Sequence, residues 1–156
     1  MMIIVTFDKI DYCKIIDKTL RDLTNGNPYH SFWLKLIPIV KYAGIYIKPY
    51  GDKYKTHIRN NDGISCKYRN QYFIFYNRDM PEQRMRWTIA HELGHCQLGH
   101  LDNDQISNEQ KEMEANIYAK NLLAPFPIIH ELKQQIPNLS AKDIAIIFNI
   151  SSEASS

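Results

Sequence analysis

The feature that most constrains the fold of this chain is a change of hydrophobic period along it. Between residues 45 and 76, short β-type runs follow one another, and turn residues such as Asn60-Asn61 and Arg69-Asn70 separate them. These runs predict three or four antiparallel strands joined by hairpins. The runs cover residues 45–49, 54–58, 63–68 and 71–76. The flanking segments have helical spacing, so the pattern predicts an α+β fold.

Helical segments lie on both sides of the strand region. Asp79, followed by Pro81 and Glu82, predicts a capped helix start immediately after the last strand. Ser107 with Gln110 predicts the start of the next helix. The predicted helices cover residues 11–23, 29–43 with Gly44 as the cap, 79–99, 107–124, 128–135 and 140–148.

Composition indicates one globular domain. The chain has 156 residues, of which 44% are hydrophobic and 23% charged, and this suffices for a core without disulfides. The three cysteines have no CxxC spacing, which favours the reducing cytoplasm. No run approaches the roughly 18 apolar residues of a membrane span, so we expect no membrane association. We expect a single domain over residues 1–156, with a core at about 44–125 and a helical C-terminal segment at 126–156.

The helix predicted after the strands contains His91-Glu92-Leu93-Gly94-His95, an HExxH sequence. Positions i and i+4 lie about 40° apart around a helix, so both imidazoles can bind one zinc ion. Glu92 can then be the general base toward a water activated by that zinc. Gly94 costs about 1 kcal/mol relative to Ala inside a helix, so we expect a neighbouring backbone to pack closely against it.

A catalytic zinc ion needs a third protein ligand, and His100, Glu112 and Glu114 are the candidates. His100 lies one residue short of the metzincin spacing, and we interpret it as a helix C-terminal side chain. Glu112 and Glu114 are two residues apart, about 200° around a helix, so only one can face the metal. Helical periodicity does not choose between them.

Other residues of the site are less constrained by the sequence. Tyr76, Tyr118 and His100 are candidates for stabilising an oxyanion. Cys96 follows a ligand directly but points about 100° away from it, so we interpret it as a buried small side chain. The strand over residues 71–76 is a candidate for binding extended substrate by β-addition.

Three linked segments resemble the ImmA/IrrE family of metallopeptidases. They are QYFIFYN at 71–77, RWTIAHELGH at 86–95 and EMEANIYAKNLLAP at 112–125. The resemblance covers roughly residues 44–125. It implies a zincin-like fold, in which a small antiparallel sheet packs against the HExxH helix and a Glu-bearing helix, with extra helices at both ends. It also implies that Glu114, before Ala115-Asn116, is the third ligand beside His91 and His95.

Members of that family act as anti-repressors. The resemblance therefore implies an endopeptidase with one Zn²⁺ per chain that cleaves a helix-turn-helix transcriptional repressor. The alternative is a protein that binds its partner without cleaving it, in a toxin–antitoxin-like or mobile-element regulatory pair. An intact Glu92 favours the enzyme. Residues 143–151 resemble half of a helix-turn-helix, but the net charge is only +2, so we expect no direct nucleic-acid binding.

Overall fold

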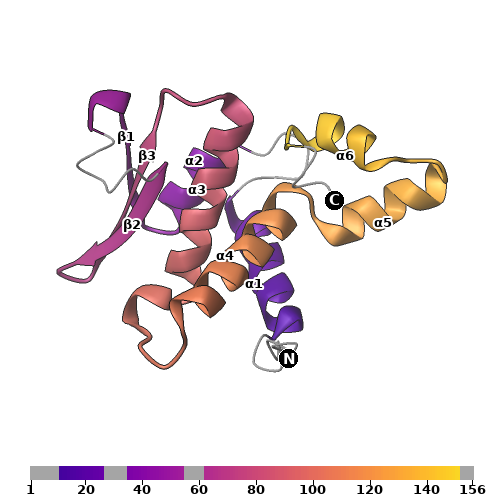
Figure 1. The fold of residues 1–156 in the computed structure, drawn as a ribbon. Coiled ribbons are helices and arrows are strands. Elements are labelled where there is room, and N and C mark those ends of the chain that lie inside the picture. The colour runs from indigo at the N-terminus through magenta and orange to yellow at the C-terminus, as the bar shows by residue number, and fades with distance from the viewer. Residues whose placement is uncertain (1–10, 27–34, 55–61, 152–156) are drawn as a thin grey trace, which may run out of the picture.

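The computed structural model describes residues 11–26, 35–54 and 62–151 of the chain (Figure 1). It has the expected α+β composition. The elements in chain order are α1 (Tyr12–Gly26), α2 (Leu36–Tyr42), β1 (Tyr46–Tyr50), β2 (Gly63–Tyr68), β3 (Gln71–Asn77), α3 (Glu82–Gln97), the short 3-10 helix η3 (His100–Asp102), α4 (Asn108–Leu123), α5 (Phe126–Gln135) and α6 (Ala141–Phe148).

The three strands form a mixed sheet in the order β1-β3-β2, so the expectation of a purely antiparallel sheet is wrong. β2 and β3 form the expected antiparallel hairpin, in which Ser65 lies opposite Ile74. β3 returns from that hairpin between β2 and β1, and its pairing with β1 is parallel. A parallel pair is possible here because a long connection that includes β2, and not a tight turn, joins β1 to β3. This order makes β3 the central strand. Most of the further run expected at 54–58 lies outside the described residues.

The helices build layers on one side of the sheet. α3 packs on β2 and β3, α4 packs on α3, and α1 packs on α4. Figure 1 shows α3 between the sheet and α4. The core along these contacts includes Ile74, Leu93, Tyr118 and Leu122, each almost inaccessible to solvent. The HExxH helix is therefore packed on two sides, against the sheet and against α4.

Two helix ends are capped by the residues that the sequence predicted. The Ser107 side chain accepts a hydrogen bond from the Gln110 backbone N–H at 3.1 Å and caps α4. After α2, Gly44 has φ +77°, and the backbone N–H groups of Gly44 and Ile45 donate to Lys41 and Val40. These two hydrogen bonds form a Schellman motif, so Gly44 ends this helix as predicted.

The expected cap at Asp79 is wrong. α3 begins at Glu82 with Pro81 in the cap position, and no side chain caps it. The Asp79 carboxylate instead accepts a hydrogen bond from the Asp52 backbone N–H at 2.8 Å. A tertiary contact across the loops thus takes the carboxylate that a local capping box would have used.

Two glycines allow close contacts around α3. A Cβ atom on Gly94 would lie 3.1 Å from Cβ and Cδ1 of Tyr118 on α4. A Cβ atom on Gly63 would lie 2.5 Å from Cγ2 of Thr88, where β2 crosses α3. Gly94 is therefore closely packed, but the Tyr118 side chain lies against it and not the backbone that the sequence predicted.

The C-terminal helices lie beside the ends of α3 and α4. Ser140 and Asp143 form a capping box at the start of α6. Nε of Arg86 on α3 donates to the Asn149 carbonyl oxygen, which fixes the end of α6 against α3. Ile144 and Phe148 of α6 belong to the buried core. Within the described residues, no helix has the length and apolar character required to cross a membrane.

Candidate metal centre

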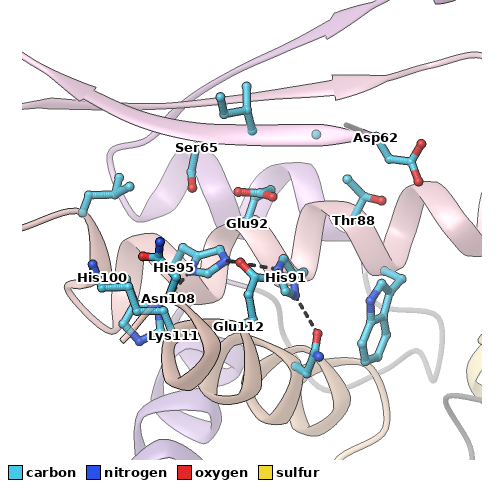
Figure 2. A pocket seen from close by; sticks show the side chains of 15 residues that line it. Asp62, Ser65, Thr88, His91, Glu92, His95, His100, Asn108, Lys111 and Glu112 are labelled. Atoms are coloured by element: carbon cyan, nitrogen blue, oxygen red, sulfur yellow. Dashed lines mark hydrogen bonds and ion pairs between the residues drawn. The ribbon is translucent and has the colours of Figure 1, made fainter. Parts of the chain in front are cut away.

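Three donor groups from α3 and α4 converge at one point. Nε2 of His91 and Nε2 of His95 are 3.1 Å apart. Each lies 3.0 Å from an oxygen of the Glu112 carboxylate. Figure 2 shows both imidazoles and this carboxylate directed toward each other between the two helices. His91, His95 and Glu112 therefore form a group that could hold a metal ion.

The donor set fits zinc in size and in chemistry. Ligands at 2.0–2.1 Å from a tetrahedral zinc ion are about 3.3 Å from one another, close to the observed separations. Two imidazole nitrogens and one carboxylate are also the ligands of many catalytic zinc sites, which keep a fourth position open. Glu112 is more than half exposed, at 59%, so the centre opens to solvent on this side.

Hydrogen bonds on the far side of each imidazole orient its Nε2 lone pair toward this point. Nδ1 of His91 lies 2.8 Å from Oδ1 of Asn116, an atom that only accepts. Nδ1 of His95 lies 2.9 Å from Nδ1 of His100, whose Nε2 lies 2.9 Å from Oε1 of Glu114. A neutral His100 donates to that carboxylate and so accepts from His95. Two lone pairs and a carboxylate then face one another, an arrangement that a cation stabilises.

Glu112, and not Glu114, meets the HExxH histidines, so the structure does not assemble the triad that the resemblance implied. Glu114 is turned toward His100, and its Oε2 accepts from Gln110 Nε2 at 3.0 Å. The physical reason is the rotation of α4, which buries Ala115 and Tyr118 against its neighbours. That rotation directs position 112 into the cleft and position 114 toward η3.

Glu92 lies between the strand layer and the two histidines (Figure 2). Burial raises the pKa of its carboxyl group, and hydrogen bonding to Ser65 on β2 opposes the rise. Burial also lowers the pKa of His95 to about 4, and the neighbouring His91 acts in the same direction. His95 is therefore a neutral imidazole at pH 7, which is the form that binds a metal. The Glu92 carboxylate has the position and the raised basicity of a general base.

Of the candidates for oxyanion stabilisation, Tyr118 and Tyr76 lie away from the cleft around Glu92, and His100 lines it with both ring nitrogens already in contact with neighbours. Tyr118 is buried and its hydroxyl donates to Asp22 on α1. Tyr76 is in the core and does not line the cleft around Glu92. His100 is 3% exposed and is held between His95 and Glu114. Cys96 is buried, as predicted, and burial raises the pKa of its thiol to about 12.

The donors open into a cleft of about 650 Å³, which we call the catalytic cleft. Its walls come from β2, α3, η3 and α4. In the described part of the chain, β2 has a neighbouring strand only on its β3 side. β3 was the strand expected to bind extended substrate, but it is the central strand and is paired on both sides, so it cannot accept a further strand. β2 is the edge that borders the cleft.

Three contributors to the site did not emerge from sequence reasoning. Asn116 lies one helical turn after Glu112, so the i, i+4 spacing on α4 was an available signal for it. Ser65 has no comparable signal, because its approach to Glu92 depends on which face of β2 packs on α3. Gly63 is similar, since only the crossing of β2 over Thr88 requires it.

An HExxH helix packed on a small mixed sheet, with a carboxylate from the next helix at its histidines, defines a metallopeptidase-type protein of the α+β class. The sequence matches the family model described as Peptidase_M78, IrrE N-terminal-like domain, over residues 40–155. The match covers most of the chain, so the chain belongs to this family, as the three linked motifs indicated. A search among curated proteins found no match.

Proposed function

We propose that this protein is a zinc-dependent endopeptidase whose metal is held by His91, His95 and Glu112. The observation that carries the proposal is the convergence of these three donors within 4.8 Å of one another, beside the buried carboxyl group of Glu92. Glu92 supports the enzyme over a partner-binding protein, because binding alone requires no general base beside the donors.

Different residues of the chain would carry out different steps of peptide hydrolysis. His91, His95 and Glu112 would hold a zinc ion, which would supply Lewis-acid chemistry for polarising the substrate carbonyl and lowering the pKa of water. Glu92 would take the proton from the attacking water and pass it to the nitrogen of the leaving amine. Asn116 and His100 would keep the imidazoles of His91 and His95 in the ligating tautomer.

The edge of β2 that faces away from β3 has no strand partner among the described residues, and it would position the substrate. An extended segment can add its backbone to this edge, and main-chain hydrogen bonds would then align it above the Glu92 carboxylate. Antiparallel addition is favoured because its hydrogen bonds are slightly more stable per residue. A folded protein has few accessible extended segments, so cleavage would favour linkers and locally unfolded parts.

The substrate that we propose is a helix-turn-helix transcriptional repressor, on the basis of the resemblance to anti-repressor peptidases and the family match. The C-terminal segment, residues 126–156, which includes α5 and α6, would contribute to docking of this partner. Such docking would confine cleavage to few sites, because a body of this size supplies few binding subsites near the zinc.

The test is incubation of the zinc-loaded protein with the purified repressor-like product of a neighbouring gene. The expected result is cleavage at one or few bonds, seen by intact-mass analysis, with casein cut weakly or not at all. Glu92→Gln is the control, because it should bind the repressor and leave it intact. Comparable digestion of unrelated unfolded proteins would refute the repressor as the dedicated substrate. Binding of the repressor without cleavage by the wild-type protein would favour the partner-binding alternative.

A further inference from the structure

We infer that a second cleft beside the catalytic cleft binds the part of the substrate that follows the scissile bond and selects acidic side chains there. This inference rests on the peptidase function proposed above. We call this site the downstream cleft. It has a volume of about 820 Å³, and its lining includes Arg84, Trp87, Asn116, Ile117, Lys120 and Ser151. Pockets of this size hold several side chains of a bound chain.

The downstream cleft adjoins the catalytic cleft. Trp87 on α3 and Asn116 on α4 line both of them. Asn116 is also the residue that contacts His91, so the boundary between the clefts lies one side chain away from the donor group. The partly buried Trp87 packs against the core and forms a fixed aromatic wall. A peptide chain that leaves the metal centre on this side passes Trp87 and enters the downstream cleft.

The direction of the substrate follows from the direction of β2. The start of β2 lies over the first half of α3, where Gly63 meets Thr88. Its end lies at η3, where Lys67 forms an ion pair with Asp102 at 2.9 Å. A substrate antiparallel to β2 therefore enters from the η3 side and leaves toward Trp87. The residues after the scissile bond are the ones that reach the downstream cleft.

The charge of the downstream cleft favours acidic side chains. Among its described lining residues, Arg84 and Lys120 are basic and none is acidic. Arg84 is already paired with Asp62 at the mouth of the catalytic cleft. Lys120 is exposed, and the described residues offer it no carboxylate partner. Lys120 is therefore the group that a substrate carboxylate would meet.

Lys120 also has a structural role, and the experiment must separate that role from the binding of substrate. Lys120 is the basic residue in the last turn of α4, where it interacts favourably with the helix dipole. Lys133 occupies the same place in the last turn of α5 and does not line the downstream cleft. Lys133→Glu therefore reproduces the change of charge and of helix-end electrostatics, without the change in the cleft.

The experiment uses the zinc-loaded full chain and peptides from a cell lysate digested with chymotrypsin. New N-termini, read by mass spectrometry, report the residues that follow each cleaved bond. In parallel, the same peptides are passed over immobilised zinc-loaded Glu92→Gln protein, and those retained are identified. The cleavage assay compares the wild type with Lys120→Glu and Lys133→Glu. The retention assay compares Glu92→Gln protein with and without each of the same two lysine changes.

We expect Asp and Glu to be enriched about two- to five-fold after the cleaved bond, the range of an exposed ion pair. Lys120→Glu should abolish or invert this enrichment, and Lys133→Glu should leave it. Equal enrichment in both lysine variants, or none in the wild type, would overturn the inference and leave the peptidase function intact. If no peptide is cleaved, the repressor assay alone tests the peptidase proposal, and the retained peptides decide the inference. Acidic enrichment lost only with Lys120→Glu supports the cleft, and any other pattern overturns it.

Discussion

Glu112 and Glu114 stand two residues apart on α4 and contact different histidines. The Glu112 carboxylate lies 3.0 Å from Nε2 of both His91 and His95, whereas Oε1 of Glu114 lies 2.9 Å from Nε2 of His100. Glu112 therefore belongs to the donor group, whereas Glu114 contacts it only indirectly, through His100 and His95. This division makes separate predictions for two chemically identical side chains.

Glu112→Gln should lower zinc affinity far more than Glu114→Gln. The first change removes a ligand, whereas the second weakens only an outer hydrogen bond, which typically costs 10- to 100-fold in affinity. Competition with a chromophoric chelator measures both. Glu109→Gln, an exposed change in the first turn of the same helix, is the control and should have little effect. If Glu112 and Glu114 exchanged their effects, the register of α4 against α3 would be wrong by two residues.

Glu92→Gln should retain about one zinc ion per chain and lose peptidase activity. Removal of a general base typically lowers the rate by about 10²–10⁴-fold, while the donor group of His91, His95 and Glu112 is untouched. Elemental analysis measures the metal, and the repressor assay measures the activity. Loss of zinc together with activity would show that Glu92 is a ligand or a structural residue instead.

His100→Phe should lower zinc affinity without removing a ligand. The change leaves Nδ1 of His95 without its 2.9 Å partner and separates Glu114 from the site. We expect a reduction of about 10- to 100-fold in affinity, as for other outer-shell partners of ligating histidines. The Glu114→Gln and His100→Phe changes act on one chain of contacts, so the double variant should lose less affinity than the sum of the two. Full additivity would show that the two residues act independently.

Acid should destabilise the metal-free protein through His95. The folded-state pKa of about 4 is below the ordinary 6.5, so the unfolded chain binds the additional proton. This contribution to stability is present above about pH 6.5 and is lost as the pH falls toward 4. The loss would be on the order of 3 kcal/mol. Urea unfolding in EDTA, on a Glu92→Gln background, should show that His95→Gln removes this part of the pH dependence.

The Glu92→Gln background is needed because the raised pKa of Glu92 makes stability fall with rising pH, whereas the lowered pKa of His95 makes it rise. Because the pKa of the buried Glu92 carboxyl group is raised, the protonated group stabilises the folded state. That stabilisation is lost as the pH rises above 4.5, the ordinary pKa of the group. Without Glu92, the remaining difference between parent and His95→Gln isolates the histidine. A difference that stays constant from pH 4 to 7 would contradict the assignment of His95 as a buried neutral imidazole.

Gly63→Ala should reduce both stability and activity, because its Cβ atom would lie 2.5 Å from Thr88 Cγ2. Overpacking of this kind costs about 1–3 kcal/mol. It would also move β2, and with it Ser65, away from Glu92. Thr88→Ala removes this closest contact, so the double variant should regain part of the loss. The backbone oxygen of Phe75, 3.1 Å from the same Cβ position, remains. Thermal unfolding and the repressor assay measure the two effects, and failure of Thr88→Ala to rescue would place the clash elsewhere.

The sequence by itself determined the features that depend on neighbours along the chain. The convergence of His91 and His95 follows from i, i+4 spacing, and the cap at Ser107 and the αL end at Gly44 follow from residues within one turn of them. Membership of the family was also evident, because its three motifs keep their order and spacing. Each of these signals is complete within a short stretch of chain.

Only the tertiary structure decided the features that depend on how distant elements pack. Helical periodicity did not choose between Glu112 and Glu114, so the choice required the rotation of α4, which the contact of Tyr118 with Gly94 and Asp22 sets. The parallel pairing of β1 with β3 is likewise a long-range contact that no local turn specifies. The same packing makes β2 the edge that borders the catalytic cleft, because strand order is a property of the sheet and not of any one strand.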